Sequence, residues 1–411
     1  MKLAYKISLI LFILCILLFI YYKVDKNILN YVNNSGITDT EIILGQTIDL
    51  SGKIVGSKSF HLGFTTAIDR YNRNGGINGR KIIYHVLDDS NNPQKALENC
   101  KLLINCYNCF CMFGSYGEVC TNEIIPYITE MGVPLIAPSS GSLSIREPFN
   151  KMVVNCQASY YDEISKIFKF MSDKKLYNFS IIYDKTNNLM NIIEKLLLLN
   201  HQMTIFNFLS YAIIDDTNDL YKPFSDIINN TTPFNKTIQK TGLESLDFII
   251  IASSEINITK IIQYFKILKP SLHFFYLSSV NTVYTSSLIK KYIHASDNIY
   301  ATTVTYKEPN TQMFKEYQEE LNLNNYKNIE PKMSFKSLSG YISGKYFCEV
   351  LLKVGNKLSR YNLLSYIYNN KISFNNINFN EFENNISNQG ISDCYLYKII
   401  NEKENDVQLV F

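Results

Sequence analysis

Short apolar runs alternate along the chain with longer segments whose apolar residues recur three and four positions apart. The first pair consists of the run Glu41 to Gly45 and the segment Leu62 to Asn72, which ends at Asn74-Gly75-Gly76. Runs of the first kind predict buried strands, and segments of the second kind predict amphipathic helices that stop at glycine. Strands that alternate with helices predict parallel βαβ units, so the chain is expected to be an α/β protein.

The same alternation continues in two blocks. Before residue 158 it predicts strands at 81–87, 109–114 and 134–137 and helices at 94–105 and 122–131. After Ala158 it predicts helices at 161–171, 188–199 and 258–267 and strands at 178–183, 203–206, 246–252 and 273–277. The Asn- and Thr-rich stretch 216–239 is expected to be irregular. Two blocks without a Gly/Pro-rich linker predict two lobes joined by short crossing segments.

The N-terminus carries a different pattern. Lys2 and Lys6 precede an apolar run from Ile7 to Tyr22, and no small-residue cleavage site follows it. The run is longer than the core of most signal peptides and shorter than most spanning helices. We therefore expect an uncleaved membrane anchor over residues 1–27 in preference to a cleaved signal, followed by a polar tether over 28–40. In either case the rest of the chain is expected on the extracytoplasmic side of a membrane, and it is secreted if the segment is cleaved.

Composition narrows the function. The 411 residues are 46% apolar and 19% charged, which is typical of a globular chain that buries substantial cores. A formal charge of +3 over this length argues against nucleic acid as a partner.

Nine cysteines are present, with a cluster between Cys100 and Cys120. Cys106 and Cys109 have the spacing of half a metal site, but no second such pair or paired histidines accompany them, so no metal and no cofactor are expected. Disulfides in the first lobe and free buried thiols both remain open, because the choice depends on the compartment.

One stretch resembles a known family. Between Gly63 and Glu163 the chain contains Asn74-Gly75-Gly76-Ile77-Asn78-Gly79-Arg80, Asp88-Asp89 with Pro93, Phe113-Gly114, Gly132-Val133-Pro134 with Pro138, Glu147-Pro148-Phe149-Asn150 and Ala158-Ser159-Tyr160-Tyr161-Asp162-Glu163. In order and spacing these resemble the branched-chain amino-acid-type (Leu/Ile/Val-binding-like) solute-binding proteins of ABC transporters, which have the type I periplasmic-binding fold. The resemblance is strong over 63–163 and weaker over the rest of 42–368.

The resemblance implies how the chain is divided. In the family the chain crosses the hinge more than once, so residues 42–155 with 303–368 are expected to form lobe one. Residues 158–300 with 369–411 are then expected to form lobe two. The function it implies is capture of a small polar ligand between the lobes by hinge closure, with an ABC permease as a possible partner.

Polar loops that follow the lobe-one strands supply candidate ligand contacts, because ligands of open parallel sheets bind at the carboxyl ends of the strands. These residues are Ser51, Tyr116, Glu118, Ser139, Ser140 and Gly141. Resemblance places Asn188, Glu255 and Ser279 opposite them on lobe two. Where amino-acid binders of the family have a Ser or Thr for the α-carboxylate, this chain has Glu118, and the family's acidic ammonium ligand is absent near Ser279. Glu118 is therefore expected to disfavour a bare carboxylate, and Glu118 and Glu255 to favour a cationic or amide ligand.

Enzyme motifs are not apparent. The chain has no Gly-x-Ser-x-Gly elbow and no phosphate-binding glycine loop after a strand. The expectation is a binding protein and not an enzyme. The alternatives are a ligand-sensing receptor ectodomain and a degenerate surface protein that binds no ligand.

Overall fold

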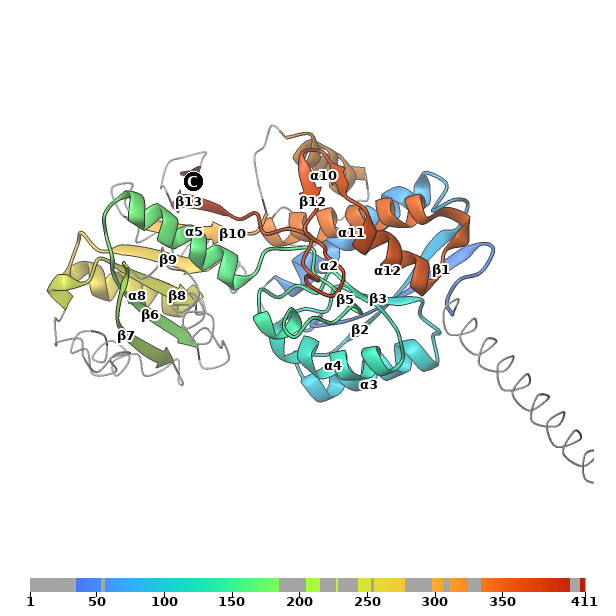
Figure 1. Ribbon diagram of the computed structural model, residues 1–411, viewed down its shortest axis with the longest axis horizontal. Helices are drawn as coiled ribbons and strands as arrows, with labels where there is room; N and C mark the ends of the chain where they lie inside the picture. The colour runs from blue at the N-terminus through green and yellow to red at the C-terminus, as the bar shows by residue number, and fades with distance from the viewer. Residues whose placement is uncertain are drawn as a thin grey trace, which may run out of the picture.

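The computed structural model describes residues 35–52, 56–184, 205–214, 227, 243–252, 255–277, 298–305, 311–323, 334–399 and 407–410. These residues form two α/β lobes that lie side by side (Figure 1). The predicted fold class is therefore confirmed. The expected anchor over residues 1–27 lies outside the described residues. In the described part of the chain, no helix is long and apolar enough to cross a membrane.

The first lobe is built on a five-stranded parallel sheet of order β2-β1-β3-β4-β5. Its strands are β1 (Glu41–Ile48), β2 (Lys81–Asp88), β3 (Cys111–Phe113), β4 (Leu135–Ile136) and β5 (Val153–Val154). Helices α3 (Pro93–Asn105) and α4 (Glu118–Glu130) cover one face of the sheet. The other face carries α2 (Ser57–Arg73), α10 (Gln312–Leu323), α11 (Phe335–Val354) and α12 (Arg360–Asn369). Both faces of the sheet are therefore covered, and β3, β4 and β5 are wholly apolar and buried.

The second lobe is built on a seven-stranded sheet of order β14-β13-β10-β9-β8-β6-β7. The parallel strands are β6 (Asn178–Asp184), β7 (Asn207–Ile214), β8 (Phe248–Ala252), β9 (His273–Leu277) and β10 (Ile299–Thr303). Strand β13 (Tyr395–Ile399) pairs antiparallel with β10, and β14 (Val407–Leu409) pairs antiparallel with β13. Helix α5 (Tyr160–Asp173) covers one face and α8 (Glu255–Leu268) the other. Of the strand expected at 203–206, residues 203 and 204 lie outside the described part, and residues 205 and 206 are not in a strand, because the described strand begins at Asn207.

The chain passes between the lobes at three places. The first passage follows β5 and enters α5, the second follows β10 and leads to α10, and the third leads from the first lobe into β13. The hairpin of β11 (Ile372–Phe374) and β12 (Ile377–Phe379) packs with Ile391 on the first core. This differs from the expectation that the whole of 369–411 closes lobe two. The reason is that Phe379 packs against Tyr346 of α11 with ring centres 4.3 Å apart, so the hairpin stays with the first lobe.

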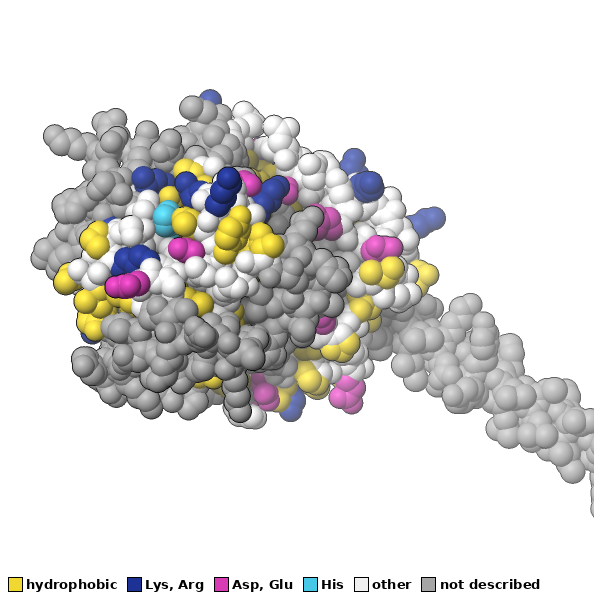
Figure 2. All heavy atoms as spheres, turned by 60° about the vertical axis from the view of Figure 1, so that its left-hand side comes forward, with side chains coloured by type: hydrophobic (Ala, Val, Ile, Leu, Met, Phe, Trp, Pro, Cys, Tyr) yellow, Lys and Arg dark blue, Asp and Glu magenta, His cyan; other side chains and the backbone are white. Residues whose placement is uncertain are grey.

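Short 3-10 helices complete the described chain at Leu143–Ile145 (η1), Leu243–Ser245 (η3) and Gly355–Lys357 (η4). The surface of the second lobe that faces the viewer in Figure 2 shows basic, acidic and hydrophobic side chains intermixed.

Candidate functional site

The carboxyl ends of β3, β4 and β5 meet at the junction of the two lobes, and the candidate site is built there. Phe113 of β3 pairs with Ile136 of β4, which pairs in turn with Val154 of β5. The chain order reverses between β1 and β3, so this edge of the sheet is the kind of switch point at which ligands of α/β proteins bind.

The loops after β3 and β4 are held together by backbone hydrogen bonds. Ser139 N donates to Ser115 O at 2.7 Å, and Gly117 N donates to Ser139 O at 3.2 Å. Tyr116 and Ser139 thereby form an isolated parallel bridge beyond the ends of the two strands. Of the residues predicted from the sequence, Tyr116, Ser139, Ser140 and Gly141 are brought together at this point and are buried.

Glu118 lies beside this group as the first residue of α4. It is half-buried, and Ser144 Oγ donates a hydrogen bond to Glu118 Oε1 at 3.3 Å. A carboxylate in the first turn of a helix also interacts favourably with the helix dipole. The pKa of the Tyr160 phenol is raised chiefly by burial and further by the negative charge of Glu118.

Ser51 lies on the exposed loop after β1. Its hydroxyl donates to Asp49 Oδ1 at 2.7 Å, and its N–H donates to Asp88 Oδ1 at 3.2 Å. The hydrogen bonds described for Ser51 therefore go to the β1 and β2 loops and not to the other predicted residues.

The predicted contacts from the second lobe are not placed. Asn188 and Ser279 lie outside the described residues, and Glu255 begins α8 with a side chain outside the described part. Their roles stay predictions.

Three residues that the sequence did not indicate also reach the site. Gln157 follows β5, Tyr160 begins α5, and Lys336 lies in the first turn of α11. Lys336 Nζ is 5.6 Å from the centre of the Tyr116 ring, and the side chain is only 4% exposed. Burial lowers the pKa of Lys336 to about 8, while the charge of Glu163 acts in the opposite direction.

Tyr160 covers the loop after β4. A β-carbon added to Gly141 would lie 2.3 Å from Cδ1 of the Tyr160 ring, so only glycine permits this contact. Tyr160 N also donates to Gly141 O at 2.8 Å. The contact ties the first turn of α5, in the second lobe, to the first-lobe loop.

Two buried polar groups at the site have no hydrogen-bond partner among the described residues. These are Ser139 Oγ and Gln157 Nε2, each in a residue only 4% exposed. Most buried polar groups in proteins are satisfied, so two such groups on neighbouring strand ends need an explanation.

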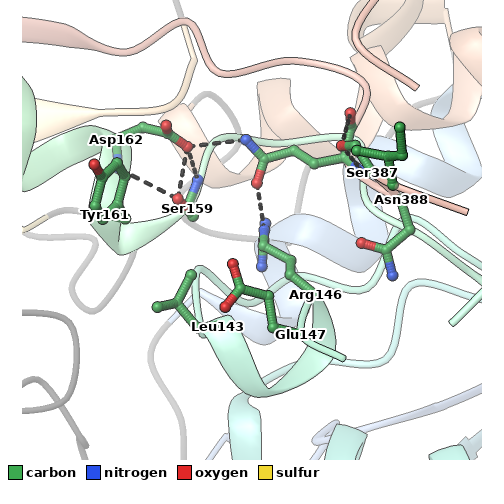
Figure 3. Close-up of a pocket in the computed structure, with 10 residues that line it drawn as sticks. Leu143, Arg146, Glu147, Ser159, Tyr161, Asp162, Ser387 and Asn388 are labelled. Atoms are coloured by element: carbon green, nitrogen blue, oxygen red, sulfur yellow. Dashed lines mark hydrogen bonds between the residues drawn. The ribbon is translucent and has the colours of Figure 1, made fainter. Parts of the chain in front are cut away.

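A pocket of about 210 Å³ opens next to this group, between η1, the start of α5 and the third passage. Figure 3 shows Arg146 and Glu147 on one side, Ser159 and Asp162 on another, and Ser387 and Asn388 on a third. The Arg146 guanidinium separates the pocket from Ser140 and Gln157, because it donates to their carbonyl oxygens at 3.0 Å each. Burial lowers the pKa of Arg146 to about 10, so it stays charged at neutral pH.

The described part of the chain contains potential metal ligands and thiols. No group of three or more His, Cys, Asp or Glu side chains there is arranged to hold a metal ion. The eight described cysteines are free thiols in this structure, and all but Cys106 are buried.

Comparison with known proteins identifies the type of fold. Residues 41–188 match the family model described as periplasmic binding protein. A search of curated proteins gives no match.

Solved structures match over nearly the whole chain. A possible leucine/isoleucine/valine-binding protein from Rhodopirellula baltica SH 1 is 14% identical, covers 90% of this chain and 96% of its own, and has a TM-score of 0.73. A branched-chain amino acid transporter substrate binding protein from Streptococcus pneumoniae, solved with isoleucine, is 14% identical with a TM-score of 0.69 and covers 90% and 99%. A fatty acid ABC transporter substrate-binding protein from Thermomonospora curvata is 15% identical with a TM-score of 0.70 and covers 92% of each chain. The chain therefore has the type I periplasmic-binding fold of these solute-binding proteins, and its residues 41–188 match the periplasmic binding protein family.

Proposed function

We propose that this protein captures a small polar solute between its two lobes, at the carboxyl ends of β3, β4 and β5. The observation that carries the proposal is the pair of buried groups without partners, Ser139 Oγ and Gln157 Nε2. A buried polar group without a partner costs about 1–3 kcal/mol, so a ligand that pairs with both groups would recover that free energy on binding. An oxygen acceptor on the solute would satisfy both.

The charges at the site favour a carboxamide or another neutral oxygen acceptor. The buried Lys336 ammonium near Tyr116 favours an oxygen ligand, while Glu118 beside the same loop opposes a second negative charge. Structural neighbours include proteins described as binding isoleucine and fatty acid, and both of those ligands carry a carboxylate. Glu118 would thus give this chain a preference for a neutral ligand, in contrast to those proteins.

Binding would proceed by closure of the second lobe on the first about the three passages. The protein would work on the extracytoplasmic side of a membrane, held by residues 1–27 and delivering its solute to an ABC permease. This is binding without catalysis.

One observation favours a second candidate, a surface protein that binds no solute. The Tyr160 ring already occupies the face of Gly141 that would otherwise approach a ligand.

Calorimetry of the full chain in detergent tests the proposal with leucine, leucinamide, urea and putrescine. Leucine and leucinamide differ only in the carboxylate, and putrescine lacks an oxygen acceptor. We expect leucinamide or urea to bind, leucine to bind more weakly than leucinamide, and Glu118→Gln to narrow that difference. Ser139→Ala should weaken binding about tenfold, through loss of one hydrogen bond.

Stability measurements provide the control. Ser139→Ala removes a hydroxyl without a partner, so the free energy of unfolding should not fall. Ser210→Ala removes a hydroxyl that lies 2.9 Å from Ser180 Oγ in the second sheet, and it should cost about 1 kcal/mol. Micromolar binding of leucine would contradict the role of Glu118. Silence across the panel would favour the surface protein.

A further inference from the structure

The third passage places one amide side chain between the two lobes. Gln389 Nε2 donates to Asp162 Oδ2 at 2.9 Å, and Gln389 Oε1 accepts a hydrogen bond from Arg146 Nε. Asp162 lies in the first turn of α5, in the second lobe, whereas Arg146 directly follows η1 in the first. One side chain thus spans the junction with a donor on one side and an acceptor on the other.

Both partners of Gln389 are fixed to their own lobes. Besides the carbonyls of Ser140 and Gln157, Arg146 donates to Ser142 O at 2.8 Å, and the residue is only 7% exposed. Asp162 Oδ2 accepts from Ser159 N at 2.7 Å and from Ser159 Oγ at 2.6 Å, as part of the capping box of α5. Because neither end is loose, the length and direction of the Gln389 amide determine how far Arg146 lies from Asp162.

The backbone around Gln389 is held separately from its side chain. Asn155 N donates to Asn388 O at 2.8 Å, and Gly390 N donates to Asn155 O at 3.0 Å, so the third passage is paired with the first. Changing the side chain of Gln389 therefore leaves these backbone hydrogen bonds in place.

The bridge borders open space. Arg146, Asp162 and Gln389 all line the pocket of about 210 Å³, where Figure 3 shows Arg146 and Asp162 facing one another across it. A polar bridge beside open space can change partners without leaving a void in a packed core.

We propose that Gln389 is a positioning residue that sets the angle between the lobes, and through it the fraction of molecules competent to capture solute. The functional part of this inference rests on the proposed function. If a solute binds only to molecules with one lobe angle, its apparent affinity rises or falls in proportion to the fraction of molecules that have that angle. Gln389 would thus tune binding without being a contact of the solute itself.

Single-molecule energy transfer on the full chain in detergent, without any solute, tests the proposal. Dyes are attached to non-canonical amino acids at Glu130 and Ile267, since both residues are exposed, one on each lobe. Gln389→Leu removes both hydrogen bonds at similar volume, and it should shift and broaden the distribution of inter-lobe distances. Gln389→Glu should do the same, because a carboxylate retains Arg146 but repels Asp162.

One further variant serves as the control. Gln94→Leu changes an exposed amide on α3 and should leave the distance distribution unaltered. An unchanged distribution in Gln389→Leu would overturn the proposal. If Gln389→Leu clearly shifts the distance distribution but the protein binds no solute, the role of Gln389 in setting the lobe angle stands, and only the proposed function is overturned.

Discussion

His61 shows how a single buried side chain ties stability to pH. Its Nδ1 lies 2.8 Å from Gln46 Oε1 on the inner face of α2, and its ring stacks on Tyr84 with ring centres 5.8 Å apart. Burial lowers the pKa of His61 from 6.5 to about 4, so the folded protein keeps the ring neutral where the unfolded chain would protonate it. The stabilisation is therefore complete above pH 6.5 and is lost as the pH falls towards 4.

We predict that His61→Asn flattens the dependence of stability on pH. Between pH 7.5 and pH 5 the wild type should lose about 2 kcal/mol of unfolding free energy through this residue, and the variant should not. His273, with a pKa of about 4 for the same reason, acts in the same direction, and Asp89, with its pKa raised to about 6 by burial, acts in the opposite one. Urea unfolding at the two pH values measures the difference, and equal losses in variant and wild type would contradict the assignment.

The polar residues that matter most at the junction were the hardest to predict. Lys336 and Arg146 are charged residues that sequence patterns place on the surface, because charged side chains are seldom buried. The burial of Lys336 depends on Tyr116, which comes from a distant segment, whereas Arg146 donates to the carbonyls of Ser140 and Ser142 just before it and of Gln157 in the first passage. Gln157 had one available signal, its place after a strand. That strand, β5, is only two residues long and was not recognised.

At the scale of elements, the regular helices and strands were predictable from their patterns. The strand expected at 81–87 is β2, the helix expected at 94–105 is α3, and the strand expected at 178–183 is β6. The strand expected at 203–206 was placed too early in the sequence. The largely apolar residues there precede a longer alternating segment, β7, whose first residue is the polar Asn207. The pairing of α2 with α11 had no local signal at all.

Three glycines allow α2 and α11 to pack closely. A β-carbon on Gly63 would lie 1.7 Å from Ser337 O, and one on Gly340 would lie 2.1 Å from Phe60 O. At Gly344 the two nearest atoms are side-chain atoms of Ala67 and Phe64, at 2.8 and 3.0 Å. At the first two glycines the added β-carbon would thus meet backbone atoms, whereas at the third the two nearest atoms belong to side chains and the Phe64 carbonyl oxygen follows at 3.3 Å.

We predict that Gly63→Ala lowers the free energy of unfolding by about 1–3 kcal/mol or more, because the added methyl meets backbone that cannot move aside. Gly344→Ala is the matched control and should cost less, since its nearest contact, Ala67 Cβ, is 2.8 Å away, whereas the contact at Gly63 is 1.7 Å. Urea unfolding followed by circular dichroism compares the two variants. Equal effects would show that the contact at Gly63 is not as rigid as the structure indicates.

At the scale of the whole molecule, the sequence predicted the two-lobed fold through motifs concentrated in 63–163. The destination of residues 372–391 was less visible, because the aromatic contact of Phe379 with Tyr346 joins segments that no sequence pattern relates. The lobe-two half of the site remains a prediction.

We predict that the full chain stays with membranes and that deleting residues 1–27 releases it. The reason is the apolar run from Ile7 to Tyr22, which is not followed by a cleavage site. Fractionation of cells that express each form, followed by intact-mass measurement, checks both points. A mature N-terminus between about residues 20 and 40 would instead show removal of a signal peptide.

Because the chain passes between the lobes three times, the first lobe is assembled from segments that are synthesised at different times. Tyr71 on α2 donates to Glu349 on α11 across 278 residues of chain, and the first core closes only with β12 and Ile391. During synthesis or transfer across a membrane, the N-terminal third therefore emerges long before the helix that completes its core. Until that helix is made, the apolar face of the N-terminal third stays exposed. The second lobe lies between the two parts in the sequence, and its own strands pair during this time. Contacts so distant in sequence make folding slow and expose the nascent chain to aggregation. A protein with this topology needs protection from aggregation until its synthesis is complete.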